Sequence, residues 1–359
     1  MQAQVKKLDF TGQNIFAGLD VHLKQWTVTI RTETLTHKTF VQPPKPEVLY
    51  EYLNKNFPGG TYHSAYEAGF CGFWIHNKLK LLGINSMVAN AADIPTTDKE
   101  KKHKIDPRDS RKIARSLSNG DLEPIYVPSI KILEDRSLIR TRATLVKDLT
   151  RFKNRIKSFL YFYGIEYPLE FSKSESHWSK KFMNWLEDIK FSEKSGKNAL
   201  NILIAEAKSL RLSLLQTNKL IRELSTSEAY KIDVSLLRTI PGIGLITSCS
   251  IITELETLNR FSNFDKLCGF IGLVPSTKSS GEKEIIGDIT SRGHSVLRSA
   301  IIESSWVAIR LDPSLMKCYL DYCKRMEPNK AIIRIAKKLL NRIRYVLKNK
   351  QPYKCLIVK

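Results

Sequence analysis

Hydrophobic and polar residues alternate along the first third of the chain in a way that predicts short strands separated by helices. An apolar run over residues 14–19 ends at Asp20, and the alternation over 26–31 predicts a strand that pairs with it as a hairpin. Further strands are expected over 37–41, 62–66 and 84–88, with helices over 46–56 and 73–82. This order predicts a mixed sheet flanked by helices, with Asp20 and Glu67 at the strand ends where open α/β sheets place their sites.

From residue 137 the apolar positions recur at intervals of three and four, which predicts a long helix, and a second such stripe runs over 203–224. The two helices could pair as an antiparallel hairpin or across subunits. Basic residues, among them Arg136 and Arg140, crowd the remaining faces of the first helix. That helix is therefore either a solvated structural element or a basic arm that grips nucleic acid. Residues 166–198 are rich in aromatic and charged residues and fit no period.

The last third is expected to be mainly helical. Residues 236–261 predict a helix, a turn over 241–244 and a second helix, which resembles a helix-hairpin-helix motif. Backbone N–H groups beside Gly242 and Gly244 could then approach a phosphate, although glycine-rich turns also simply join helices. A basic amphipathic helix is expected over 330–348. We therefore expect three domains, over 1–128, 129–230 and 231–359, the middle one a long helical or coiled-coil region.

The charge balance points to a polyanionic partner. The 359-residue chain has 58 Lys and Arg against 36 Asp and Glu, a formal net charge of +22. Nucleic acid is the leading candidate for that partner. The same charge excess would also fit a ribosome-like structural protein or a peripheral membrane protein. The six cysteines are scattered without a metal or redox spacing, and no apolar run is long enough to span a membrane or serve as a leader. We expect a cytoplasmic protein with reduced cysteines.

Four carboxylates are candidates for one metal site. Asp106 and Asp109 stand three residues apart where a helix is expected to begin, so they share one helix face and can point at one ion, together with the strand-end residues Asp20 and Glu67. Such carboxylates repel one another unless a cation lies between them, and hard oxygen ligands suit Mg²⁺ or Mn²⁺ in phosphoryl transfer. Taken singly, each acid could equally be a surface residue or a helix cap, above all Asp106 before Pro107.

Short motifs in a fixed order resemble the DEDD-type insertion-sequence transposases, the family that includes the Piv DNA invertase. The resemblance covers about residues 20–125 and 235–310. Its motifs lie at 17–22, 67–69, 106–109, 240–244, 270–275, 279–281, 289–294 and 297–298.

The resemblance implies a specific activity. It implies an N-terminal domain of ribonuclease H-like fold, similar to RuvC-type junction resolvases, with Asp20, Glu67, Asp106 and Asp109 as catalytic metal ligands. It also implies that Ser280 is the nucleophile that attacks a DNA phosphodiester, with Ser279 as the neighbouring alternative.

The same resemblance implies the partners of the reaction. These are donor and target DNA, a guide RNA encoded by the element, and further copies of the chain in a dimer or tetramer whose subunits share the site. The protein is then expected at the bacterial nucleoid. Arg292 and Arg298, beside a helix start near the serine, are expected to contact phosphate.

Two other classes of function remain open at this stage. One is a structure-selective endonuclease, a junction resolvase that uses the carboxylates alone and forms no covalent intermediate. The other is a non-catalytic nucleic-acid-binding protein whose acidic residues are structural. DNA cleavage that needs Ser280 would indicate the transposase. Cleavage without Ser280 would indicate the resolvase, and binding without cleavage would indicate the non-catalytic protein.

Overall fold

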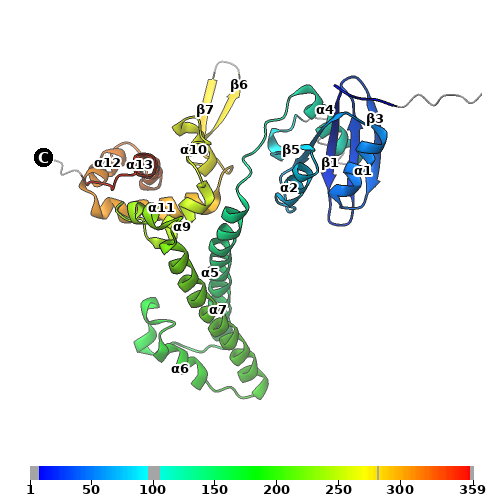
Figure 1. Cartoon of the computed structure of the whole chain (residues 1–359). Coiled ribbons are helices and arrows are strands. Elements are labelled where there is room, and N and C mark those ends of the chain that lie inside the picture. Colours follow the sequence, from blue (N-terminus) through cyan, green and yellow to red (C-terminus); the bar gives the residue numbers. More distant parts are fainter. Residues whose placement is uncertain (1–7, 96–105, 281–282, 356–359) are drawn as a thin grey trace, which may run out of the picture. The chain divides into compact units, whose positions relative to one another are not determined.

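The computed structural model describes residues 8–95, 106–280 and 283–355, with the backbone alone at 106, 277–280 and 283–286. The chain forms two compact units, Met1–Val127 and Pro128–Lys359 (Figure 1). The expected division of the second part into separate domains at 129–230 and 231–359 stays a prediction.

A five-stranded mixed sheet forms the centre of the first unit. The strand order is β3-β2-β1-β4-β5, in which β1, β2 and β3 are antiparallel and β4 and β5 run parallel to β1. The strands are β1 Asn14–Val21, β2 Trp26–Arg31, β3 Thr36–Gln42, β4 Thr61–Glu67 and β5 Asn85–Ala89.

Helices cover both faces of this sheet. The helices of the unit are α1 Pro46–Asn56, α2 Trp74–Leu81, the short η1 Ala91–Asp93 and α4 Asp106–Asn119. Alternate residues of β1, such as Ala17 and Leu19, pack in one core with Leu49 of α1 and Ile75 of α2. Gly18, between them in β1, lies directly against α4 on the other face. Because successive residues of β1 point to opposite faces of the sheet, the strand contacts α1 and α2 on one face and α4 on the other.

The elements expected in the first third are confirmed to within one or two residues. The helix expected at 46–56 and the strand expected at 26–31 have the expected bounds, three further strands extend by one or two residues, and the strand expected at 84–88 lies at 85–89. The mixed sheet with flanking helices is confirmed. The prediction succeeds because every element here has one apolar face with a regular period.

A long helical hairpin opens the second unit. Helix α5 Ile130–Phe162 packs along α7 Lys194–Thr226 within one chain, so the pairing as a hairpin is confirmed. Helix α5 begins at Ile130 rather than at 137, because the hydroxyl oxygen of Ser129 accepts a hydrogen bond from the Ile132 N–H and caps the helix.

Residues 166–198, which fit no period, fold into a small aromatic cluster against the hairpin. They contain η2 Leu169–Phe171, η3 Ser174–Ser176 and α6 Lys180–Asp188. Phe171 and Phe182 are buried here and stack edge to face, with ring centroids 5.2 Å apart. Short helices and turns around a few large rings carry no repeat, so the sequence pattern does not reveal them.

Helices make up most of the remainder, as expected. The apolar face of α13 packs in one hydrophobic core with α9, α11 and α12. Ile335, Leu339 and Ile343 of this face are completely buried. The basic amphipathic helix expected at 330–348 is thereby confirmed. The helices are α8 Lys231–Leu237, α9 Leu245–Leu255, α10 Phe264–Ile271, α11 Ser295–Leu311, α12 Pro313–Cys323 and α13 Pro328–Asn349.

A two-stranded antiparallel hairpin, for which the sequence analysis predicted no strands, interrupts these helices. It consists of β6 Pro275–Ser280 and β7 Lys283–Ile289. Its serine, lysine and glycine residues give no apolar alternation, so only the backbone pairing reveals it.

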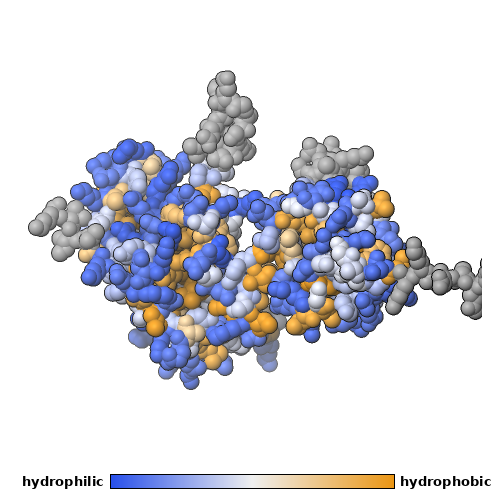
Figure 2. Space-filling view, turned by 45° about the horizontal axis from the view of Figure 1, so that its top comes forward, coloured by the Kyte–Doolittle hydropathy of each residue, from blue (hydrophilic) through white to orange (hydrophobic). Residues whose placement is uncertain are grey.

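The visible surface is mainly hydrophilic, with apolar residues in scattered patches (Figure 2). Within the described part of the chain, no helix is both long enough and apolar enough to cross a membrane.

The close approach of α4 to β1 at Gly18 generates a first prediction. A Cβ atom at Gly18 would lie 2.3 Å from the Ser110 carbonyl oxygen and 2.3 Å from the Ala114 nitrogen, both of them helix backbone. We expect Gly18→Ala to lower the free energy of unfolding by about 3 kcal/mol, because backbone atoms must move to admit the methyl group. Urea unfolding measures this. Gly69→Ala, which meets nothing within 4 Å, is the control, and equal stability of the two variants contradicts the packing argument.

Candidate functional site

Two strand-end carboxylates lie side by side at one edge of the first unit's sheet. Leu19 of β1 pairs with Tyr66 of β4 in parallel register, so Asp20 and Glu67 come next on neighbouring strands. Asp20 is one-fifth exposed, and its Oδ2 lies 3.4 Å from His22 Nε2. The sequence prediction for both residues as strand-end acids is confirmed.

Helix α4 brings a third carboxylate to the same edge. The helix begins at Asp106, as expected, and its first turn carries Asp109. The Ser110 and Thr29 hydroxyl oxygens lie 2.8 Å apart, and this buried hydrogen bond fixes the turn against β2. The side chain of Asp106 lies outside the described residues. Its place beside the other acids therefore stays a prediction.

A lysine that the sequence analysis did not single out joins two of these acids. Lys112 Nζ lies 3.3 Å from Asp109 Oδ1 and 3.8 Å from Glu67 Oε1, and its side chain is only 9% exposed. Glu67 and Asp109 are therefore close enough to share one positive charge. The available signal was the spacing of three residues between Asp109 and Lys112 on one helix face.

The chemistry of this edge suits a divalent cation. Among the side chains that the structure describes, no three acidic, histidine or cysteine residues lie close enough together to hold a metal ion, and Asp106 is outside that set. Two carboxylates nevertheless already share a cation, the Lys112 ammonium group. Oxygen donors gathered around a positive charge are the ligand type that Mg²⁺ and Mn²⁺ take. The carboxylates offer the right kind of donor atom, and a metal site built from them together with Asp106 stays a prediction.

Ser280 lies at the tip of the β6–β7 hairpin in the second unit. It is the last residue of β6 and pairs in the backbone register with Lys283, the first residue of β7, while Ser279 pairs with Glu284. The side chains of these four residues, and residues 281–282 altogether, lie outside the described part of the chain. The choice of Ser280 over Ser279 as nucleophile stays a prediction.

Two glycine residues pack directly against each other at the base of this hairpin. Gly272 ends α10 with a φ of +84°, and Gly293 precedes α11 with a φ of +122°. A Cβ atom at Gly293 would lie 2.6 Å from the Gly272 Cα. Only glycine combines this close approach with positive φ angles, so both glycines fix where the two strands leave the helical core.

The predicted phosphate contacts have different surroundings in the structure. Arg298 is half-buried, and its Nη1 donates a hydrogen bond to the Thr290 carbonyl oxygen at 2.5 Å, whereas Arg292 is exposed. A Cβ atom at Gly242 would lie 2.2 Å from the Ser304 carbonyl oxygen of α11, but one at Gly244 would meet nothing within 4 Å. Gly242 therefore has a packing role, and phosphate binding by these residues stays a prediction.

A buried carboxylate, Glu254 of α9, joins three segments near the hairpin. Arg140 of α5 donates two hydrogen bonds to it, from Nε at 2.8 Å and from Nη2 at 2.9 Å. Arg136 Nε lies 3.2 Å from its Oε2, and His294 Nε2 lies 3.0 Å from the same oxygen. The sequence analysis placed both arginines on the outer faces of a long helix, which is wrong for Arg136 because it is buried against α9.

His294 hydrogen-bonds through both of its ring nitrogens. Its Nδ1 accepts a hydrogen bond from the Leu297 N–H and caps α11, so Nε2 can carry the proton that it donates to Glu254. Burial alone raises the pKa of the Glu254 carboxyl, but hydrogen bonds from His294 and Arg140 outweigh it and bring the pKa to about 2. Glu254 is therefore charged at neutral pH.

Replacing Glu254 by glutamine removes the charge and preserves the shape. We expect Glu254→Gln to lower the free energy of unfolding by about 3 kcal/mol at neutral pH, because two arginines then face a neutral amide in a buried site. The wild-type protein loses stability as the pH falls from 4.5 towards about 2, since the folded-state pKa lies below the unfolded one, and the variant lacks this component.

Urea unfolding followed by far-UV circular dichroism across that pH range measures both effects. Glu223→Gln, at an exposed position of α7, is the matched control. The same pH profile in wild type and Glu254→Gln contradicts the assignment of this charge.

Two sequence families match the chain, and between them they cover both candidate sites. Residues 17–165 match the DEDD family of IS110-type elements, described as "Transposase", and residues 234–320 match the "Transposase IS116/IS110/IS902 family". The first match contains Asp20, Glu67, Asp106 and Asp109, and the second contains Ser280.

Curated relatives agree with these matches. A protein of Sinorhizobium fredii described as "Putative transposase y4qE" is 27% identical over 67% of this chain and 57% of its own length. The transposase for insertion sequence element IS1111A of Coxiella burnetii is 28% identical over 58% and 56%, and that for IS1533 of Leptospira borgpetersenii is 25% identical over 70% and 72%. The chain thus spans little more than half the length of the first two. With both family matches in the expected order along one sequence, the chain belongs to the DEDD-type family of insertion-sequence transposases.

Proposed function

We propose that this protein is a DNA transposase that cuts and rejoins DNA strands through attack of Ser280 on phosphodiesters, assisted by the acidic edge of its first unit. The observation that carries the proposal is the contact of Glu67 and Asp109 with Lys112, with Asp20 beside Glu67 on the neighbouring strand, within a chain whose two family matches are both transposases.

The topology of the first unit supports a ribonuclease H-like fold for the catalytic domain. Three antiparallel strands continue into two parallel ones, and α4 crosses the central strand β1. Carboxylates at the ends of the two central strands and on the crossing helix then converge on one substrate phosphate. The fold supplies positions, and the chemistry comes from these side chains.

The proposed cleavage step exchanges one phosphoester for another. A bond forms between Ser280 Oγ and the DNA phosphorus, and the bond from that phosphorus to one deoxyribose oxygen breaks. The leaving oxygen becomes a free hydroxyl and takes up the proton that Ser280 gives up. The number of phosphoester bonds is unchanged, so rejoining to a hydroxyl of another strand is the reverse of the same step and needs no ATP.

The serine needs activation, because a hydroxyl is a poor nucleophile at its ordinary pKa. Lys283 pairs with Ser280 in the backbone register of the hairpin, and Arg292 follows β7 on the exposed surface. The Lys283 amine, when deprotonated, can take the hydroxyl proton, and Lys283 or Arg292 in the charged form can stabilise charge on the phosphoryl group.

Asp20, Glu67, Asp106 and Asp109 are proposed to hold Mg²⁺ or Mn²⁺. When bound, the ion supplies Lewis-acid stabilisation of charge on the transferring phosphoryl group. The carboxylate oxygens would bind the ion, and the ion in turn would bind the substrate phosphate. Lys112 keeps Glu67 and Asp109 close together.

Donor and target DNA are the proposed substrates, with a guide RNA encoded by the element as a further partner. The net charge of +22 supports binding of either polyanion. A dimer or tetramer is proposed as the working form.

Ser280→Ala tests the nucleophile against its neighbour. The purified protein is incubated with labelled DNA that carries the junction of the element's ends, with the flanking RNA and Mg²⁺, and is analysed on a denaturing gel. We expect wild type and Ser279→Ala to form a covalent protein–DNA species and Ser280→Ala to form none, because only the hydroxyl at 280 is proposed to attack. Ser280→Ala should retain DNA binding. Cleavage that survives in Ser280→Ala supports the junction-resolvase alternative instead.

Lys112→Met tests the charge balance at the acidic edge. We expect Mg²⁺ to raise the melting temperature of this variant more than that of wild type, because Glu67 and Asp109 repel each other once the ammonium group is gone. Thermal unfolding in EDTA and in Mg²⁺ measures the difference, with the exposed Lys55→Met as the control. An equal Mg²⁺ effect in the three proteins argues against a cation site at Glu67 and Asp109.

A further inference from the structure

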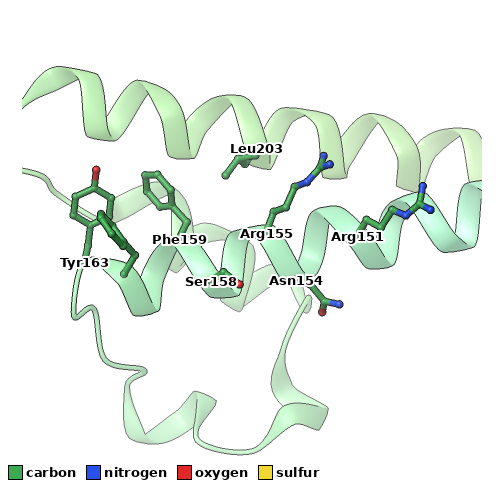
Figure 3. Close-up of a pocket in the computed structure, with 8 residues that line it drawn as sticks. Arg151, Asn154, Arg155, Ser158, Phe159, Tyr163 and Leu203 are labelled. Carbon is green, nitrogen blue, oxygen red and sulfur yellow. The ribbon is translucent and has the colours of Figure 1, made fainter.

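The far end of the α5–α7 hairpin has a hollow that the proposed strand-transfer reaction does not use. It is a shallow hollow, widely open to solvent, of about 840 Å³, and is lined by the last turns of α5 and by Leu203 of α7. Arg151 and Arg155 lie along one side and Phe159 and Tyr163 lie at the tip, as the close-up shows (Figure 3). This end of the hairpin lies away from α9, where its other end packs.

Aromatic rings at this tip are exposed to solvent. Phe162 is 80% exposed and Tyr163 is 49% exposed. The rings form a chain of contacts, with centroids 4.9 Å apart for Phe159 and Tyr163 and 5.1 Å apart for Phe162 and Tyr163. Phe191 closes the cluster at 5.2 Å from Tyr163. Packing on one side holds the cluster in place, while Phe162 keeps a ring open to a ligand.

The charged side chains that line the hollow are both arginines, Arg151 and Arg155. Arg155 makes no ion pair with any acid that the structure describes, and its guanidinium group lies over the Phe152 ring, 4.8 Å from the centroid. Arg151 contacts Asp148 at 3.1 Å but is itself 70% exposed. The hollow therefore combines flat apolar rings with positive charge, and Asn154 and Ser158 add hydrogen-bonding groups.

This combination selects among possible occupants. A second copy of the chain, docked here by a two-fold axis, would bring Arg151 and Arg155 against the same arginines. A DNA duplex covers the faces of its bases by stacking, so its phosphates could use the arginines but its bases could not use the rings. Unpaired nucleotides offer both a π face and a phosphate, and unpaired bases beside helical stems are the usual state of folded RNA.

We propose that the hollow at the end of the α5–α7 hairpin binds an unpaired segment of RNA, with a base stacked on Phe162 and a phosphate at Arg155. The inference rests on the proposal that the protein works on nucleic acid, but it does not depend on Ser280 or on the carboxylates.

Binding and crosslinking of a short RNA test the proposal. The probe is a fluorescent, uridine-rich RNA of about 12 nucleotides that carries 4-thiouridine, used with the full chain. A DNA of the same sequence and a duplex of the same length serve as comparison ligands. Tyr345→Ala, which removes an exposed aromatic residue of α13, is the matched control for Phe162→Ala.

We expect Phe162→Ala and Arg155→Ala each to weaken RNA binding by about tenfold, as loss of one stacked base or one phosphate contact predicts, and Tyr345→Ala to leave it unchanged. The crosslink should map to the tryptic peptide 158–173. The single-stranded DNA should bind more weakly and the duplex should not compete.

Three results would overturn the proposal. The first is a crosslink outside 158–173 together with unchanged affinity in both variants. The second is single-stranded DNA that binds more tightly than RNA with the same dependence on Phe162. The third is a change of sedimentation in Phe162→Ala without a change in RNA affinity, which would make the tip a contact between subunits. Since Ser280→Ala should still bind the RNA, failure here leaves the test of the nucleophile intact.

Discussion

The buried carboxylate of Glu254 is the interaction on which the arrangement of the second unit depends. It receives hydrogen bonds from Arg140 of α5 and lies within hydrogen-bonding distance of His294, which begins α11. Those two residues connect the long helical hairpin and the end of the β6–β7 hairpin to α9. Because a buried carboxylate without partners is costly, the three segments must keep their mutual positions for the charge to stay satisfied. The close backbone contact between Gly272 and Gly293 then sets the direction in which the β6–β7 hairpin leaves the helical core.

A comparable constraint acts in the first unit. Gly18 allows α4 to approach β1 more closely than any side chain would permit, and the hydroxyl pair of Ser110 and Thr29 fixes the first turn of the helix. The consequence is that Asp109 and Glu67 both reach the Lys112 ammonium group. The acidic edge is therefore a result of backbone packing, and the residues that make it possible carry no charge.

Much of this could be predicted from the sequence, for a physical reason. Asp20 and Glu67 lie at the ends of strands whose apolar faces repeat every second residue, and Asp109 lies in the first turn of a helix, so local periods place all three. Ser280 came from the resemblance to a family, because a polar hairpin has no period of its own. Glu254 and Arg140 pair across more than a hundred positions of the chain, and the α6 region packs around a few rings. Neither leaves a local pattern, and Arg136 was misplaced for the same reason.

The central claim is that Ser280 holds the DNA strand covalently. Mass analysis of the trapped protein–DNA species, trimmed with nuclease and digested with trypsin, tests it most directly, because residues 279–283 form one short tryptic peptide. We expect a nucleotide attached covalently to this peptide, and fragmentation of the peptide in the mass spectrometer should place the nucleotide on Ser280. Cleaved DNA in a reaction that leaves this peptide unmodified would contradict the account and assign cleavage to the carboxylates of the first unit alone.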